Sequence, residues 1–185
     1  MNRRVFFIVI FLIVIVAVTA FVYTRTLQKP APPTTTRQSN VWSGVIPGQT
    51  TADEIYQRLG VPVASTGSAA GQTLSYPSAN KYWTNDIDVQ NNKAVFIKER
   101  VFAPAELSLS KRVASLGGDG VTLYGPDFSS GINLYVFPSL GVALYGSQAQ
   151  NIVYEVWRFT PTTIQGFLAS PQAQGFSPSS PSGSF

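Results

Sequence analysis

Apolar residues along this chain fall into one long run followed by several short alternating segments. The run extends from Val5 to Val22 with Thr19 as its one polar member, and arginines stand before and after it. A helix of this length can cross the roughly 30 Å hydrocarbon core of a bilayer. We therefore predict a transmembrane helix over residues 5–24, preceded by a cytoplasmic tip of residues 1–4.

A cleaved signal peptide is the alternative for this run, because Val18-Thr19-Ala20 loosely fits a small-residue cleavage site. The run is longer than the apolar core of such peptides, so we favour the uncleaved helix. The short N-terminal tail favours a cytoplasmic N-terminus. This predicts a single-pass protein of the cell membrane whose C-terminal part is extracytoplasmic, that is, periplasmic or extracellular.

Two segments lack any apolar periodicity. Residues 25–43 are rich in proline and threonine, which predicts a semi-extended spacer. Residues 162–185 form a short terminal segment that continues into a tail rich in serine, proline and glycine. Such a composition buries little apolar surface, so we expect the tail to be disordered from Ser170 onward.

The stretch between these segments begins with a helix signal. Thr51 and Glu54 have the spacing of a capping box, and Gly60 is placed to end the helix. Alternating segments at residues 73–76, 82–89 and 94–102 then predict three antiparallel strands.

A second copy of this order follows at a spacing of 57 residues, which separates Thr51 from Ser108 and Gly60 from Gly117. Strand-like segments follow at residues 121–124, 132–137, 142–145 and 152–159. The repeat predicts an α+β fold of two tandem helix-plus-antiparallel-meander units, at residues 44–104 and 105–161, preceded by one N-terminal transmembrane helix.

The segment Ile46-Pro47-Gly48-Gln49-Thr50-Thr51, followed by Glu54-Ile55 and Leu59-Gly60-Val61-Pro62, resembles the start of a BamE-like domain of the SmpA/OmlA family. That resemblance implies a helix followed by a three-stranded meander. The tandem arrangement is similar to β-lactamase inhibitory protein. The chain departs from both, since it has no cysteine for a lipid anchor or for disulfides.

Charge argues against nucleic acid as a partner. The chain has 13 basic and 9 acidic residues, but five of the basic residues lie before position 40. The remainder is close to neutral and offers no electrostatic footprint for phosphates.

Two residue types that enzymes often use in catalysis are also missing. The chain contains no histidine and no cysteine, which removes the usual general base, nucleophile pairings and metal ligands. Asp86 and Asp88 could bind a hard cation, but we favour a solvated sheet face. Gly117-Gly118-Asp119-Gly120 fits a helix end better than a phosphate loop, and Lys111-Arg112 fits a solvated helix face. We predict no catalytic residues, no cofactor and no metal.

Aromatic residues supply the strongest functional indication. Tyrosine and tryptophan serve protein interfaces well, and two short helices cannot cover them all. The alternative is that they fill the core and the contact between the two units. The protein-binding residues that we predict are Tyr76, Tyr82, Trp83, Tyr135, Phe137, Tyr145 and Trp157.

These observations lead to a functional hypothesis. We expect a membrane-anchored, non-enzymatic module that binds other membrane or envelope proteins as an accessory or scaffolding subunit. Residues 5–24 would contact the lipid bilayer. The alternative is an inhibitor of a secreted or periplasmic enzyme, and an enzyme that uses only Ser, Lys, Tyr and carboxylates is a third class.

Overall fold

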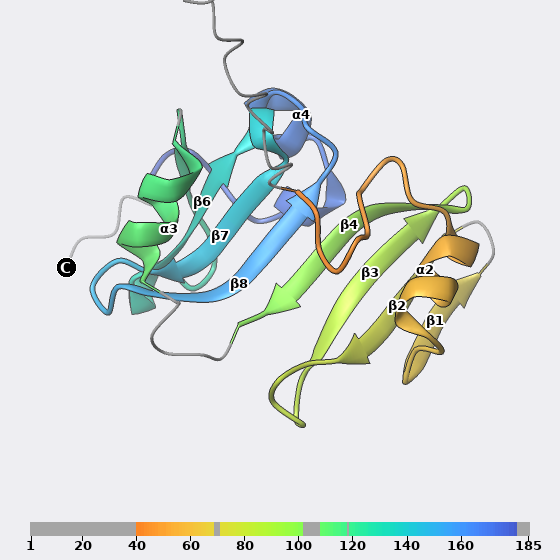
Figure 1. Ribbon diagram of the computed structural model, residues 1–185. Coiled ribbons are helices and arrows are strands. Elements are labelled where there is room, and N and C mark those ends of the chain that lie inside the picture. The colour runs from red at the N-terminus through yellow and green to blue at the C-terminus, as the bar shows by residue number, and fades with distance from the viewer. Residues whose placement is uncertain (1–39, 69–70, 102–107, 118, 181–185) are drawn as a thin grey trace, which may run out of the picture. The chain divides into compact units, whose positions relative to one another are not determined.

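The computed structural model describes residues 40–68, 71–101, 108–117 and 119–180 (Figure 1). The helices are α2 (Ala52–Leu59), α3 (Leu109–Leu116) and α4 (Ile164–Leu168). The strands are β1 (Ala64–Ser68), β2 (Gly71–Pro77), β3 (Thr84–Gln90), β4 (Lys93–Arg100), β5 (Val121–Tyr124), β6 (Ile132–Phe137), β7 (Val142–Ser147) and β8 (Ile152–Phe159). Short 3-10 turns are η2 (Phe128–Ser130), η3 (Pro138–Leu140) and η4 (Pro171–Ala173).

All eight strands belong to one antiparallel sheet in the order β1-β2-β3-β4-β8-β7-β6-β5. The prediction of an α+β fold with two tandem helix-plus-meander units was therefore wrong. Strands β4 and β8 pair directly, from Phe96 opposite Phe159 to Arg100 opposite Glu155. Where the structure describes the chain, it is thus mainly β, with a continuous sheet and few helices.

The local helix signals of the sequence are confirmed. Thr51 caps α2 in a capping box: its hydroxyl accepts from the Glu54 N–H at 3.3 Å, and the Glu54 carboxylate accepts from the Thr51 N–H at 2.8 Å. The bond from the Thr51 N–H, followed by a second bond that the Thr51 hydroxyl donates to the same carboxylate at 3.1 Å, lowers the pKa of Glu54. Ser108 caps α3 through a longer bond to the Lys111 N–H, at 3.4 Å.

Helices α2 and α3 cover the same face of the sheet, which we call the helix face (Figure 1). Under α2 lies an apolar cluster around Ile55, Leu74 and Ile87. Under α3 lies a second cluster around Leu109 and Val156. Both helices are short, so they are stabilised more by this packing against the sheet than by the helix propensity of their residues.

The opposite face, which we call the tail face, carries a third cluster. Residues 164–176 cross β6, β7 and β8 and bury Phe167 and Ala173 against them. Ser177 then forms an antiparallel bridge with Tyr124 of the edge strand β5. The disorder predicted from Ser170 onward is thus wrong for residues 170–180, whereas residues 181–185 lie outside the described residues.

A close approach explains one glycine in this contact. A Cβ atom added at Gly125 would lie 2.5 Å from the ring of Phe176. Glycine is therefore required where the terminal segment meets β5. Phe176 also makes edge contacts with Trp157 and Tyr145, at centroid distances of 5.8 and 6.4 Å.

The localisation predicted from the sequence is corrected as well. None of the helices in the described part of the chain combines the length and the apolar composition that crossing a bilayer requires. The segment for which a span was predicted, residues 5–24, lies outside the described residues, as do residues 1–4 and most of the 25–43 spacer. A single-pass membrane localisation is therefore not carried into the function proposed below.

The two caps allow a matched test. Thr51→Ala removes both the hydroxyl acceptor and the support for Glu54, so we expect a loss of about 1 kcal/mol in the free energy of unfolding. Ser108→Ala removes a longer bond without a returning carboxylate, so its loss should be smaller. Urea unfolding measures both, and equal losses would contradict the capping box as the source of the difference.

The terminal segment allows a second test. Phe176→Ala removes a half-buried ring from the tail face, and we expect a loss of about 2 kcal/mol, below that for a fully buried phenylalanine. Tyr82→Ala is the control, since its ring is 79 % exposed and its loss should stay within about 0.5 kcal/mol. Urea unfolding again reports both, and an unchanged midpoint for Phe176→Ala would show that the segment does not stabilise the sheet.

Candidate functional site

The seven predicted aromatic residues divide into three groups. Tyr76, Phe137 and Trp157 are buried, so they belong to the core. Tyr135 and Tyr145 are half-buried on opposite faces. Tyr82 and Trp83 are exposed, and they stand together in the turn between β2 and β3.

The turn that carries the two exposed rings is held by Asn80. The Asn80 side-chain oxygen accepts from the Tyr82 N–H at 3.0 Å, and its carbonyl accepts from the Trp83 N–H at 3.0 Å. The Ser78 hydroxyl donates to that same carbonyl at 2.8 Å. Local hydrogen bonds of this kind fix the turn, so the rings are presented by an ordered loop.

Trp83 does not continue the alternation that the sequence suggested. Ile87 and Val89 point into the helix-face core, whereas the Trp83 ring lies under the guanidinium of Arg100 at 4.9 Å. Arg100 belongs to the tail face and pairs with Glu155 of β8. The stacking therefore ties the exposed turn to the central strands of the sheet.

Glu155 is the most buried carboxylate of this region, with 5 % of its surface exposed. One of its oxygens pairs with Arg100, and the other accepts from the Trp157 indole N–H at 2.6 Å. A buried carboxylate needs both kinds of partner, because its desolvation is otherwise costly. Trp157, which we predicted as a binding residue, thus serves to orient the Glu155 carboxylate through its indole N–H.

A hollow of about 520 Å³ opens beside Trp83 and Arg100. Its remaining walls are Val101, Asp127, Ile132, Tyr145, Tyr154 and Glu155. The Tyr145 hydroxyl donates to Asp127, and burial, followed by this bond, raises the pKa of Tyr145. Tyr145 therefore stays neutral and keeps its donor role over the physiological pH range.

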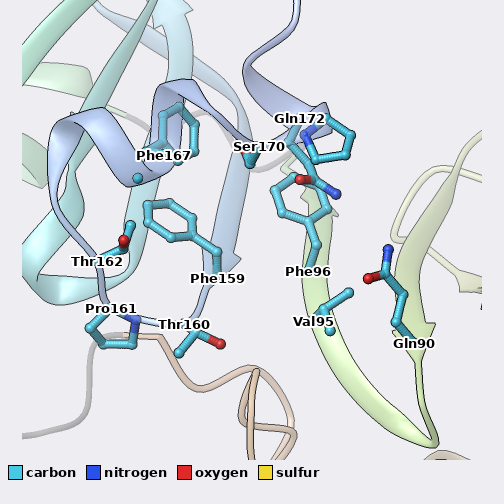
Figure 2. Close-up of a pocket in the computed structure, with 12 residues that line it drawn as sticks. Gln90, Val95, Phe96, Phe159, Thr160, Pro161, Thr162, Phe167, Ser170 and Gln172 are labelled. Atoms are coloured by element: carbon cyan, nitrogen blue, oxygen red, sulfur yellow. The ribbon is translucent and has the colours of Figure 1, made fainter.

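A second hollow, of about 350 Å³, lies where the terminal segment meets β4 and β8 (Figure 2). Figure 2 shows the Phe159 and Phe167 rings facing each other, at a centroid distance of 4.8 Å, with Gln172 near Phe96. The lining of this hollow combines three core phenylalanine rings with uncharged polar side chains such as Gln90 and Gln172. It offers no charged group to a ligand.

The predicted aspartates lie on the tail face as expected, and neighbouring hydroxyls bind both of them. Thr73 donates to Asp88 at 2.7 Å, and Ser75 donates to Asp86 at 2.8 Å. Gln172 of the terminal segment approaches Asp88 at 3.5 Å. Within the described residues no group of three side chains of metal-binding type comes together.

Sequence reasoning did not single out Arg100, Glu155 or Asp127. Arg100 and Glu155 are 55 positions apart, and only the pairing of β4 with β8 brings them together. The sequence carries only a weak signal for the pair, because alternation along residues 94–102 puts Arg100 on the same side as Lys98, away from Val101, and identifies no partner for it.

No family model matches the chain, and no curated protein matches it either. Among solved structures, an extracellular protein containing a SCP domain from Bacillus anthracis str. Ames aligns with 13 % identity and a TM-score of 0.42, over 71 % of this chain and 48 % of that one. A cysteine-rich secretory protein from Staphylococcus aureus subsp. aureus Mu50 aligns with 9 % identity and a TM-score of 0.41, over 69 % and 49 %.

This chain therefore spans about half the length of the two solved structures. The TM-scores are too low for the likeness to carry any argument about function. Both neighbours are SCP-domain or cysteine-rich secretory proteins, and neither is a BamE-like domain or a β-lactamase inhibitory protein. The resemblance suggested by the sequence is corrected accordingly, and neither activity is transferred to this chain.

The Arg100–Glu155 pair leads to a test of the site's framework. Arg100→Met leaves Glu155 buried without its cation, so we expect a loss of about 2–3 kcal/mol, below the fully buried case because Arg100 is partly exposed. Adding Glu155→Gln should recover most of this loss, since a glutamine oxygen can still accept from Trp157. A double-mutant cycle by urea unfolding measures the coupling, and additive losses would contradict it.

Proposed function

We propose that this chain is a non-enzymatic protein-binding module, an accessory or scaffolding subunit that contacts its partner through the exposed turn at Tyr82 and Trp83. One observation carries the proposal: two consecutive residues of a hydrogen-bonded turn expose aromatic rings, and one of these rings is stacked on Arg100. Trp, Tyr and Arg are the residues in which interface binding energy concentrates.

The surroundings of the turn support the same proposal. Trp83 keeps half of its surface exposed although Arg100 covers one of its faces. The Lys81 ammonium lies 5.0 Å from the Tyr82 ring and adds a solvated charge at the rim. An apolar centre with a polar rim is the usual arrangement of a protein interface.

The proposal is tested by site-specific crosslinking in the cells that make the protein. A photoreactive phenylalanine derivative replaces Tyr82 in the full chain, and Tyr56 in a matched control. Tyr56 is an exposed tyrosine on α2 that does not belong to the turn. We expect a discrete protein adduct at Tyr82 only, and we expect Trp83→Ala to reduce it strongly because the neighbouring ring is lost from the interface. No adduct at Tyr82, or the same adducts at both positions, would contradict the proposal.

A further inference from the structure

The hollow beside Trp83 has room for a large side chain and the main-chain atoms next to it. Its volume of about 520 Å³ falls within the roughly 300–1,000 Å³ of small-ligand pockets. Val101 and Ile132 supply aliphatic walls, and the Tyr145 and Tyr154 rings supply aromatic ones. Burying an apolar group there is favourable, and an aromatic ring can make edge or stacked contacts with the tyrosines.

The polar groups of the hollow are nearly all satisfied from within the chain. Both oxygens of Glu155 have donors, and Asp127 accepts from Tyr145. Arg100 is different: its Nε atom is buried and has no hydrogen-bond partner among the described residues. Because this atom is buried, an incoming group cannot reach it, and the surface that the hollow offers to a ligand is therefore that of its aliphatic and aromatic walls.

The chain itself shows how this face holds an extended segment. Phe176 places its ring against Tyr145 and Trp157, and the next residue, Ser177, exchanges two main-chain hydrogen bonds with Tyr124, at 2.8 and 2.9 Å. An aromatic anchor combined with main-chain hydrogen bonding is thus already used on the tail face. Tyr145 contacts Phe176 and also lines the hollow.

These observations lead to one inference, which rests on the function proposed above and names the chemistry of the partner. The geometry points to an extended peptide segment of the partner that inserts an aromatic side chain into the hollow, beside the stretch of the tail face on which Phe176 and Ser177 already lie. Trp83 closes the hollow on the side of the exposed turn. Binding of the segment and contact with Tyr82 and Trp83 belong to one interface.

N-acetyl-phenylalaninamide is the probe, because it carries one aromatic ring and peptide carbonyls. NMR titration of the isotope-labelled full chain follows the indole N–H signal of Trp83, assigned with Trp83→Phe. We expect a saturable shift of this signal, and Overhauser contacts between the ring protons of the probe and the Ile132 methyl groups. N-acetyl-alaninamide should bind at least about tenfold more weakly, because it lacks the ring that fills the hollow.

Two variants provide the matched comparison. Ile132→Phe places a larger side chain in the hollow and should weaken binding of the probe at least about tenfold. Ile152→Phe makes the same change at an exposed isoleucine that does not line the hollow, and should leave binding unchanged. A missing shift, equal binding of the two amides, or contacts to residues other than those of the hollow would overturn the inference. The contacts to Ile132 are measured in the unsubstituted chain, so the test does not depend on the folding of Ile132→Phe.

The outcome separates this inference from the proposed function. If the probe fails to bind while crosslinks still form at Tyr82, the peptide inference is overturned and the protein-binding proposal stands. If crosslinks at Tyr82 are absent while the probe binds the hollow, the proposed function is overturned, and with it the inference that the hollow and the turn form one interface.

Discussion

The pairing of β4 with β8 is the contact through which each half of the sheet supports the other. Charged side chains cross this junction on both faces: Arg158 donates to Glu99 at 2.7 Å on the helix face, and Arg100 pairs with Glu155 on the tail face. Arg158 is buried, with 8 % of its surface exposed, and this burial lowers the pKa of its guanidinium, opposed by the attraction to Glu99. Such pairs cost desolvation, so they add little net stability, yet they penalise any other register strongly.

Apolar contacts across the same junction stabilise it further. Phe96 of β4 meets Trp157 of β8 edge to face, at a centroid distance of 5.5 Å. Trp157 also stacks on Tyr145 and receives the edge of Phe176. The tryptophan is therefore the point where the central strands and the terminal segment meet. Its indole N–H orients Glu155, so the packing of the core also sets the electrostatics of the candidate site.

The sequence predicted what depends on neighbouring residues. The caps at Thr51 and Ser108 follow from side chains three positions apart, and most strands follow from alternation. It did not predict β1, because Ala64–Ser68 consists of small residues, all exposed, without alternation. It also missed the single sheet, since a repeat indicates two similar segments but not whether their last strands pair. The terminal segment was misjudged because a few apolar residues, among them Phe176, outweigh a composition typical of disorder.

The candidate site lies where it does because the helix face and the tail face of the sheet are covered to different extents. Helices α2 and α3 each cover one half of the helix face, whereas on the tail face the described residues supply one covering segment, over β6 to β8. On the other half the strands carry polar residues such as Asp86 and Asp88, which can remain in water. At the border between the covered and the open part of the tail face, the buried Glu155 pairs with Arg100, and the half-exposed Trp83 ring stacks on that same arginine. Trp83 and Arg100 stand at that border, which is where an additional segment could extend the cover that residues 164–177 begin.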